Sequence, residues 1–362
     1  MPAIRGGAVN RFWSQMGPAL VRQGVQVTIC ARADRNQTPS ENVEGVRYYR
    51  CGGFDSMGIR EYDYVRSLLY AFRMWVTLPK ADLYILNDAF SPLLAGLCRR
   101  GNRTVVAVGR APKGQFRWFS RRLHFVAPTS EIKRRIVKEA PHLEACCKVL
   151  PYAIDYNRLA STDGAAAGNT DRDARLLYAG RIHPEKGIGL LVSAFRQFHE
   201  VHPNFRLSIL GPWLEEQGGG GNAYRREMQR EAKGLPVDWL EPEFDFDRLS
   251  AYYRSAQYFV YPSLATDGET FGVAPLEAMA CGAIPIVSGL ECFDDFIQAG
   301  QNGFRFSHRV SDAAGALAKA MCAAVASDAQ RLSLAATDTA RQYSIDTVSR
   351  QWFDYLSTLV RS

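Results

Sequence analysis

Apolar positions along the chain alternate between two spacings, and this alternation predicts strands followed by helices. Short β-branched and aromatic runs predict strands in the first part of the chain, at Val25–Cys30, Gly45–Arg50, Leu83–Leu86, Thr104–Val108 and His124–Pro128. Apolar residues at helical spacing predict helices between them, over 8–23, 61–77, 91–100 and 131–139. Strands and helices that alternate in this way are typical of an α/β protein with a doubly wound parallel sheet.

The alternation resumes after a polar stretch without periodicity, Ser161–Asp173, which we interpret as the domain boundary. Further strands are predicted at Arg175–Ala179, Arg206–Leu210, Val237–Leu240, Tyr258–Tyr261 and Ile284–Val287. Helices are predicted over 187–199, 222–233, 247–255, about 311–326 and about 345–360. We therefore expect a first domain over 1–150, a second over 151–343, and a terminal helix within 344–362 that packs back toward the first domain.

Composition narrows the class of protein. A chain of 362 residues is long enough for two domains, since single cores stop growing at about 250–300 residues. No apolar run approaches the roughly 18 residues of a membrane span, and the N-terminal residues lack the apolar core of a secretory signal. The eight cysteines contain no C-x-x-C pair, which argues against zinc and a disulfide framework. These features predict a cytoplasmic protein.

The net charge of +7 is unevenly distributed. The stretch from Arg110 to Lys138 contains nine basic residues but only one acidic residue, and four aromatic residues are interleaved with them. This pattern suits an anionic membrane surface or a phosphorylated acceptor, although a solvated basic face over core aromatics is an equal alternative. The candidate acceptor or membrane residues are Arg110, Lys113, Arg117, Trp118, Arg121 and Arg122. Nucleic-acid-binding signatures are absent, so we expect no nucleic-acid partner. The basic and aromatic stretch predicts instead a cytoplasmic protein that is peripheral on the inner face of the cytoplasmic membrane.

Two carboxylates eight positions apart, Glu269 and Glu277, mark the first chemical candidate. Pro275 fits a first helical turn, so Glu269 is predicted in a loop and Glu277 on the helix that follows. Gly282 is predicted to stop this helix. A helix N-terminus after a glycine turn offers N–H groups to an anion or a polyhydroxylated ligand. The alternative is an ordinary loop and helix with two solvated glutamates.

Two cations, Arg181 and Lys186, follow the strand that ends at Ala179. Ligands of open α/β sheets collect at the carboxyl ends of strands, so both cations could reach the Glu269 loop and bind a diphosphate there. An exposed loop with ordinary surface charges is the alternative. The glycine run Gly218–Gly221 lacks the Lys-Ser/Thr of a P-loop, and we interpret it as a flexible surface insertion.

Together these motifs resemble the retaining glycosyltransferases of family four. The resemblance rests on Gly180-Arg181, Glu185-Lys186-Gly187, the Pro262-Ser263 strand end, the Glu269…Glu277 frame and the segment Val149–Asp155. It implies a GT-B fold, in which two Rossmann-like domains with doubly wound parallel sheets face a central cleft. The second domain of such enzymes binds a nucleotide sugar, and the first receives the acceptor.

The resemblance also implies roles for individual residues. Glu269 would bind hydroxyls of the donor sugar, Glu277 the ribose hydroxyls, and Arg181 with Lys186 the departing diphosphate. The remaining donor-binding residues implied by the family motif are Gly6, Gly7, Gly180, Thr270, Phe271, Gly272 and Val273. Glycines let backbone approach the diphosphate closely, because no Cβ stands in the way. The resemblance further implies that the acceptor attacks the sugar from the same face as the diphosphate leaves, so no enzymic nucleophile is required.

Three features depart from the family pattern or test it. Met1 stands at the loop that carries Gly6 and Gly7, so the first strand of the N-terminal sheet is missing, and we expect a misassigned start or a truncated sequence. Relatives often place His-Gly where this chain has Gly109-Arg110, so that contact is absent or moved to Arg110. The D-x-D sequence that begins at Asp245 precedes a helix, and Asp247 is interpreted as its N-cap rather than a metal ligand.

The sequence therefore predicts a retaining hexosyltransferase that needs neither a metal nor a cofactor. Its donor would be a UDP- or GDP-linked sugar, and its acceptor a glycan, a glycolipid or a small molecule. Two alternatives stay open: a nucleotide-sugar epimerase of GT-B architecture, and a non-catalytic module that binds sugar nucleotides or membranes.

Overall fold

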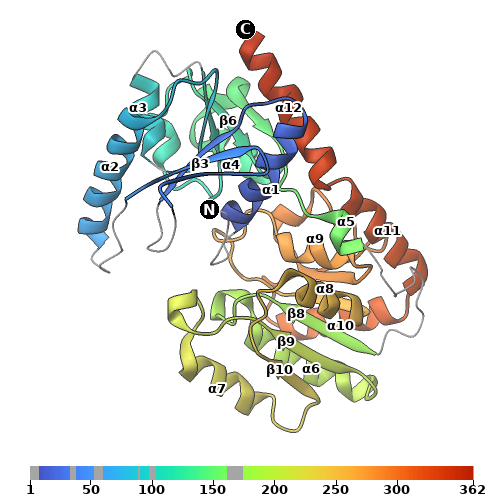
Figure 1. Cartoon of the computed structure of the whole chain (residues 1–362). Helices are drawn as coiled ribbons and strands as arrows, with labels where there is room; N and C mark the ends of the chain where they lie inside the picture. The colour runs from blue at the N-terminus through green and yellow to red at the C-terminus, as the bar shows by residue number, and fades with distance from the viewer. Residues whose placement is uncertain are drawn as a thin grey trace. The chain divides into compact units, whose positions relative to one another are not determined.

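The chain forms two compact units, which are shown in a computed structural model (Figure 1). The structure describes residues 8–32, 38–52, 60–88, 90–97, 103–160 and 174–361. The first unit contains Met1–Ala153 together with Ile345–Ser362, and the second contains Ile154–Ser344. Ser161–Asp173, the stretch interpreted as a boundary, lies outside the described residues, as do Gly6 and Gly7.

A six-stranded parallel sheet forms the centre of the second unit, in the order β10-β9-β8-β11-β12-β13. Its strands are β8 (Arg175–Ala179), β9 (Arg206–Leu210), β10 (Val237–Leu240), β11 (Tyr258–Tyr261), β12 (Ile284–Ser288) and β13 (Phe304–Phe306). Strands β8 and β11 are neighbours, and the chain leaves this pair in opposite directions along the sheet. Such a switch point is where ligands bind in open α/β sheets, outside the carboxyl ends of the strands.

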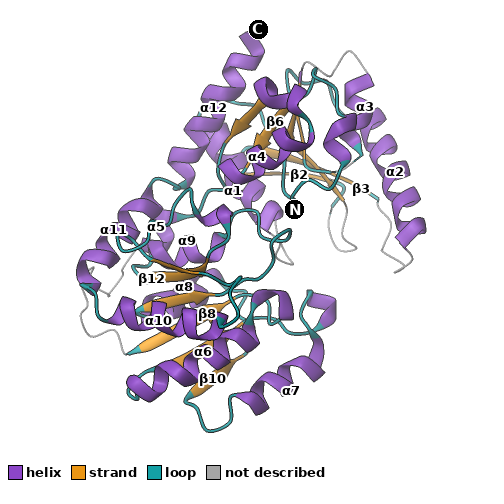
Figure 2. Cartoon of the chain, turned by 180° about the vertical axis from the view of Figure 1, so that it is seen from behind, coloured by secondary structure: helices purple, strands orange, loops and turns teal. Residues whose placement is uncertain are grey.

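Helices flank this sheet in two groups (Figure 2). One group pairs α6 (Ile188–Val201) with α10 (Ala313–Val325), and the other packs α9 (Val273–Ala280) against α5 (Tyr156–Ala160), α8 (Phe246–Ser255) and α11 (Ala329–Arg341). The remaining helix, α7 (Gly221–Glu231), packs on α6. Strands β11 and β12 are buried at every position, which explains why their sequences are continuously apolar rather than alternating.

The first unit contains two sheets within the described residues. Parallel strands form one sheet in the order β4 (Tyr84–Leu86), β5 (Thr104–Ala107), β6 (His124–Ala127) and β7 (Cys147–Val149). The other has the order β1 (Thr28–Arg32), β3 (Val46–Cys51), β2 (Ser40–Val43), and only β2 is antiparallel. The helices of this unit are α1 (Ala8–Arg22), α2 (Arg60–Thr77), α3 (Ser91–Leu97), α4 (Ser130–Glu139) and α12 (Ile345–Arg361).

The last helix, α12, packs against the first helix, α1, although they are at opposite ends of the sequence. Trp352 is 1% exposed, and its ring lies 5.2 Å from that of Trp13 and 6.3 Å from that of Phe12. Aromatic pairs at these centroid separations contribute about 0.5–1.5 kcal/mol beyond their buried area. The C-terminal helix is therefore part of the first unit's core.

The predicted elements agree well with these assignments. The bounds of β8, β9, β10 and β11 are those predicted from the sequence. Strands β2, β7 and β13 and helices α5 and α11 were not predicted. The three strands and α5 are too short to give a clear periodic signal. Across the described part of the chain, none of the helices combines the length and apolar character that crossing a bilayer requires.

Candidate active site

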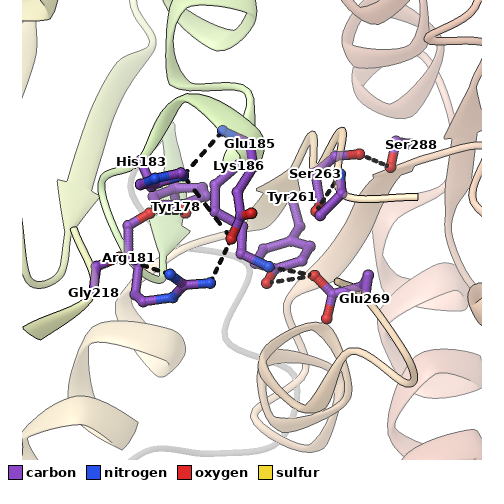
Figure 3. Close-up of polar contacts among 11 residues, drawn as sticks. Tyr178, Arg181, His183, Glu185, Lys186, Gly218, Tyr261, Ser263, Glu269 and Ser288 are labelled. Carbon is purple, nitrogen blue, oxygen red and sulfur yellow. Dashed lines mark hydrogen bonds and ion pairs between the residues drawn. The ribbon is translucent and has the colours of Figure 1, made fainter. Parts of the chain in front are cut away.

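A buried ion pair joins the loops that follow β8 and β11. Lys186 Nζ lies 2.7 Å from Glu269 Oε2, and the two side chains are only 8% and 10% exposed. The hydroxyl of Tyr261, the last residue of β11, donates to the same carboxylate oxygen at 3.0 Å (Figure 3). Burial and then the charge of Glu269 raise the pKa of Tyr261 well above its ordinary value, so this phenol keeps its proton and remains a donor.

A glycine lets the two loops approach each other. Gly187 has φ of 72°, and a Cβ there would lie 2.2 Å from the carbonyl oxygen of Pro262. Immediately beside it, the N–H of Leu264 donates to the carbonyl oxygen of Glu185 at 2.8 Å. Any side chain at position 187 would separate the loops, so the Glu185-Lys186-Gly187 sequence fixes where the Lys186 ammonium is placed.

Arg181 lies at the carboxyl end of β8 in a different environment. Its guanidinium donates through Nη2 to Glu185 Oε1 at 2.5 Å and through Nη1 to the carbonyl oxygen of Gly218 at 2.6 Å (Figure 3). The Arg181 and Glu185 side chains are 41% and 36% exposed. The hydroxyl of Tyr178 donates to the carbonyl oxygen of Arg181 at 2.8 Å, which fixes the backbone that carries the guanidinium.

Tyr178 and Tyr261 form a layer beneath the two cations. Their rings are stacked with centroids 5.9 Å apart and an interplanar angle of 10°. The ammonium of Lys186 lies 5.6 Å from the centroid of the Tyr261 ring, within cation–π range. Burial raises the pKa of Tyr178 well above its ordinary value, as it does for Tyr261. The two tyrosines thus give the site an apolar surface through their rings and hydrogen-bond donors through their hydroxyls.

The second carboxylate, Glu277, is buried on α9. It is 2% exposed, and the Tyr253 hydroxyl donates to its Oε2 at 3.3 Å. The alternative of two solvated glutamates is therefore wrong. The predicted division is confirmed, since Glu269 lies in a loop and Glu277 lies on the helix.

Helix α9 begins beside this loop without a side-chain cap. Its N-cap is Gly272, with φ of 91°, and a Cβ there would lie 2.4 Å from the ring of Phe293. Phe271 is buried against Phe296, while Val273 opens the helix and Thr270 precedes Phe271 in the loop. Uncapped N–H groups and the helix dipole favour an anion at this end.

The glycine run Gly218–Gly221 corrects one prediction. It is not a flexible insertion, because Gly219 and Gly221 are buried and the carbonyl of Gly218 accepts from Arg181. Gly180, at the end of β8, is equally constrained: a Cβ there would lie 2.8 Å from the Tyr178 hydroxyl. Close packing of backbone and side chains explains both glycine positions.

The D-x-D sequence also differs from the prediction. Asp245, not Asp247, caps α8, because the helix begins one residue earlier than expected, at Phe246. Asp245 Oδ1 accepts from the N–H groups of Asp247 and Arg248 at 3.1 and 3.0 Å. Asp247 instead accepts two hydrogen bonds from Arg158, at 2.8 and 2.7 Å.

The basic residues singled out from the sequence lie in the first unit. Their side chains are exposed at Arg110, Lys113, Arg117, Arg121 and Arg122, and Trp118 is 79% exposed. The other three interleaved aromatics, Phe116, Phe119 and Phe125, are buried together in the core. Three of the aromatics are therefore core residues, as the alternative of a basic face over core aromatics expects, while Trp118 is exposed at the surface. The interpretation as a membrane or acceptor surface stays a prediction.

Sequence reasoning missed four contributors to the site. These are Tyr178, Tyr261, Glu185 and Gly218. The two tyrosines carry a detectable signal, because a tyrosine near the carboxyl end of a buried strand brings a hydroxyl that needs a partner. No local pattern indicates that the carbonyl of Gly218 reaches Arg181, since 37 residues separate them.

Comparisons with solved structures identify the fold. An Anabaena protein solved with UDP and glucose superposes with a TM-score of 0.70 at 16% identity, covering 99% of this chain and 96% of that one. A glycosyltransferase from Rickettsia africae gives 0.74 at 15% identity, covering 99% and 97%. The fold is therefore GT-B: α/β, with Rossmann-like domains.

Sequence profiles identify the family. Residues 163–337 match "Glycosyl transferases group 1", and residues 7–149 match "Glycosyl transferase 4-like domain". The two matches together span most of the sequence, and the chain belongs to the glycosyltransferases of family four, as the motifs predicted.

Individual relatives share limited sequence identity with this chain. A lipopolysaccharide 1,2-N-acetylglucosaminetransferase of Salmonella typhimurium is 30% identical over 38% of this chain and 35% of its own length, so the match spans about a third of that relative. A D-inositol 3-phosphate glycosyltransferase of Geodermatophilus obscurus is 26% identical over 78% of this chain and 70% of its own length.

Proposed function

We propose that this protein transfers a hexosyl group from a nucleotide-diphosphate sugar to a glycan, glycolipid or small-molecule acceptor, with retention and without a metal. One observation carries the proposal: Arg181, Lys186 and Glu269 lie on the loops at the carboxyl ends of β8 and β11, and the Glu269 loop leads into the uncapped start of α9. Cations, a carboxylate and helix N–H groups are the groups that a sugar diphosphate requires.

The cations account for the chemistry of departure. As the bond from the anomeric carbon to the diphosphate breaks, negative charge grows on the diphosphate and positive charge grows on the sugar. Arg181 offers a planar fork to phosphate oxygens and Lys186 a point charge, so together they take the role that a divalent metal plays elsewhere. Fixed charges of this kind stabilise the transition state because they need no reorganisation during the reaction.

Retention follows from attack on the face from which the diphosphate leaves. The acceptor oxygen bonds to the anomeric carbon beside the departing oxygen, which accepts the acceptor's proton. No carboxylate nucleophile is needed on the opposite face. Glu269 then serves as a hydrogen-bond acceptor for the sugar: within the described residues, Lys186 and Tyr261 both contact its Oε2, which leaves Oε1 for a hydroxyl.

Glu277 is assigned to the ribose of the donor. Its side chain is buried and receives the Tyr253 hydroxyl, so the carboxylate is fixed on α9 before any ligand arrives. The UDP bound to the Anabaena structure and the sugar-transferring activities of the relatives support a nucleotide-sugar donor for this chain, with UDP or GDP as its nucleotide.

Incubation with a panel of UDP- and GDP-sugars tests the proposal, with transfer and donor hydrolysis both measured. We expect turnover with at least one donor in the presence of EDTA, and loss of that turnover in the double variant Arg181→Ala/Glu277→Ala. Arg206→Ala is the matched control, because Arg206 is also half-exposed and carboxylate-paired but lies at the amino end of β9. Turnover that survives the double substitution would refute the assigned roles.

The same assay separates the alternatives. An epimerase would invert a sugar centre of the donor without any acceptor, and its product would still carry the nucleotide. A non-catalytic module would bind UDP or GDP in calorimetry and release no sugar. Transfer with retained anomeric configuration, read by proton NMR coupling constants of the product, excludes both.

For the first unit we propose contact with an anionic membrane through the surface around η2 (Gln115–Trp118). Trp118 is 79% exposed, and Lys113, Arg117, Arg121 and Arg122 are exposed around it. The loop is anchored by hydrogen bonds: Glu139 accepts from the N–H of Gly114 at 2.8 Å and from that of Phe116 at 2.5 Å. A tryptophan held among cations suits the interface of anionic lipids.

Vesicle sedimentation tests this surface. Vesicles with phosphatidylserine should retain the protein at low salt, neutral vesicles should not, and Trp118→Ala with Arg117→Ala should weaken retention. Val310→Ala is the control, because Val310 is an exposed apolar residue of the second unit. Equal retention of the variant and the wild type would refute the proposal, as would loss of acceptor affinity without any vesicle binding.

A further inference from the structure

The glycine run that follows β9 contacts the candidate leaving-group cation. Gly218 accepts a hydrogen bond from Arg181 Nη1 at 2.6 Å, and Glu185 accepts one from Nη2 at 2.5 Å. A guanidinium has five N–H donors. Among the described residues these two bonds use one donor each, so three remain for a ligand, including one on each terminal nitrogen.

The run is tied to the chain on both sides. The N–H of Gly220 donates to the carbonyl oxygen of Ile182, the neighbour of Arg181, at 2.9 Å. The N–H of Ile182 in turn donates to Pro212 at 2.8 Å, and the N–H of Gly221 donates to Trp213 at 2.7 Å. The backbone of Ile182, next to Arg181, is therefore bonded to the same loop that supplies the Gly218 carbonyl.

Glycine is required here for steric reasons. A Cβ at Gly219 would lie 2.2–2.4 Å from backbone atoms of Trp213, which cannot move as a side-chain end could. A Cβ at Gly218 would lie 3.3 Å from Cδ and Nη1 of Arg181, and φ there is 78°. A flexible linker would show neither constraint. The packing of the run places the carbonyl oxygen of Gly218 within hydrogen-bond distance of Arg181 Nη1.

We propose that Gly218–Gly221 and Glu185 form a positioning element for Arg181, which fixes the plane of its guanidinium so that the remaining N–H groups bind the diphosphate of the donor. The inference rests on the proposed function of Arg181. Because the Arg181 side chain is 41% exposed, packing alone does not select its rotamer, and the two acceptors supply that selection.

A double-mutant cycle with a nucleotide diphosphate as ligand tests this element. The probe is whichever of UDP and GDP the wild-type protein binds more tightly in calorimetry. We expect Arg181→Ala to weaken binding about tenfold or more, and Gly219→Ala to weaken it about three- to tenfold. In the Arg181→Ala background, Gly219→Ala should change the dissociation constant by less than about twofold, because the group it positions is gone.

A matched pair of glycine substitutions controls for folding. Gly218→Ala and Gly234→Ala carry similar backbone strain, with φ of 78° and 83°, but a Cβ at Gly234 meets nothing within 4 Å. Only Gly218→Ala should weaken nucleotide binding, while both should lower the melting temperature to a similar extent. If both weaken binding equally, or if Gly219→Ala weakens it equally with and without Arg181, the run is merely structural.

Glu185 is tested by comparing two substitutions that both remove its charge. Glu185→Gln keeps an oxygen that accepts from Arg181, whereas Glu185→Leu does not. We expect the glutamine variant to bind the nucleotide at least threefold more tightly than the leucine variant, and equal affinities would contradict the role of Glu185. Failure of both UDP and GDP to bind the wild type would refute the proposed function itself. A strong effect of Arg181→Ala with none from the glycine and Glu185 variants would refute only this inference.

Discussion

The two cations of the candidate site differ in how they are fixed. Lys186 is 8% exposed and pairs with a carboxylate that is 10% exposed, above a layer of stacked tyrosine rings. Arg181 is 41% exposed and is bound by a partly exposed carboxylate and a backbone carbonyl. A buried ion pair cannot easily separate, because each charge left alone would be uncompensated in a medium of low polarity.

This difference suggests a division of labour. Lys186 holds Glu269 in place and adds its charge to the site as a fixed field. Arg181 lies closer to solvent, and its two acceptors hold the guanidinium in place while its remaining N–H groups are left for the diphosphate. If so, substitutions at the buried pair should affect folding and activity together, whereas substitutions at Arg181 should affect activity alone.

The largest effect is expected from Lys186→Met. It leaves the carboxylate of Glu269 buried without its partner, and breaking such a pair by removing one member costs about 3–5 kcal/mol. Urea unfolding should show a much lower midpoint, together with loss of transfer activity. The double variant Lys186→Met/Glu269→Gln should recover part of the stability and none of the activity. An unchanged urea midpoint for Lys186→Met would mean that the pair is not buried in solution.

Arg181→Ala comes next. Removing one fixed donor to developing charge lowers kcat by about a hundred- to a thousandfold. The free energy of unfolding should change by less than about 1 kcal/mol, because a partly exposed ion pair contributes little. Steady-state kinetics and urea unfolding measure the two quantities, with Arg206→Ala as the control. A large loss of stability would contradict the contrast between the two cations.

Tyr261→Phe should have an intermediate effect on the buried side. The ring stack with Tyr178 persists, but Glu269 loses a hydrogen bond, and bonds to charged groups contribute about 1.5–3 kcal/mol. We expect a destabilisation of that order and a raised KM for the donor, since the carboxylate is less well oriented. Tyr253→Phe, which removes the corresponding bond to Glu277, is the matched comparison. If Tyr261→Phe leaves KM unchanged, Lys186 alone orients Glu269.

Much of this arrangement could be predicted from the sequence. Strands β8 to β11 are apolar runs between turn residues, and their bounds followed from periodicity. The loop position of Glu269 and the helical position of Glu277 followed from Pro275 and the glycines around it. These are local signals, carried by a few neighbouring residues.

What could not be predicted is long-range contact. The pairing of Lys186 with Glu269 spans 83 positions, and the bond from Arg181 to Gly218 spans 37. The glycine run illustrates this limit. Its composition predicts a linker, whereas in the structure the run packs against the backbone of Trp213 and the side chain of Arg181. The helix start at Phe246 was missed by one residue, because two aspartates competed for the cap.

The smallest expected effect is on the pH dependence of stability, and it tests whether water reaches the buried tyrosines beside Lys186. Burial raises the pKa of Tyr178 well above its ordinary value of 10.0. The folded state therefore keeps a proton that the unfolded chain releases above pH 10, so this contribution to stability is complete below pH 10 and is lost as pH rises beyond it. Tyr178→Phe should lower stability at pH 8, through its lost bond to Arg181, but should make the decline between pH 9.5 and 11 shallower. Urea midpoints across that range measure the slope, with Tyr252→Phe as the control, because Tyr252 is a partly exposed tyrosine of α8. Parallel curves for wild type and Tyr178→Phe would mean that water reaches the tyrosine layer, and the contrast between Lys186 and Arg181 would lose its physical basis.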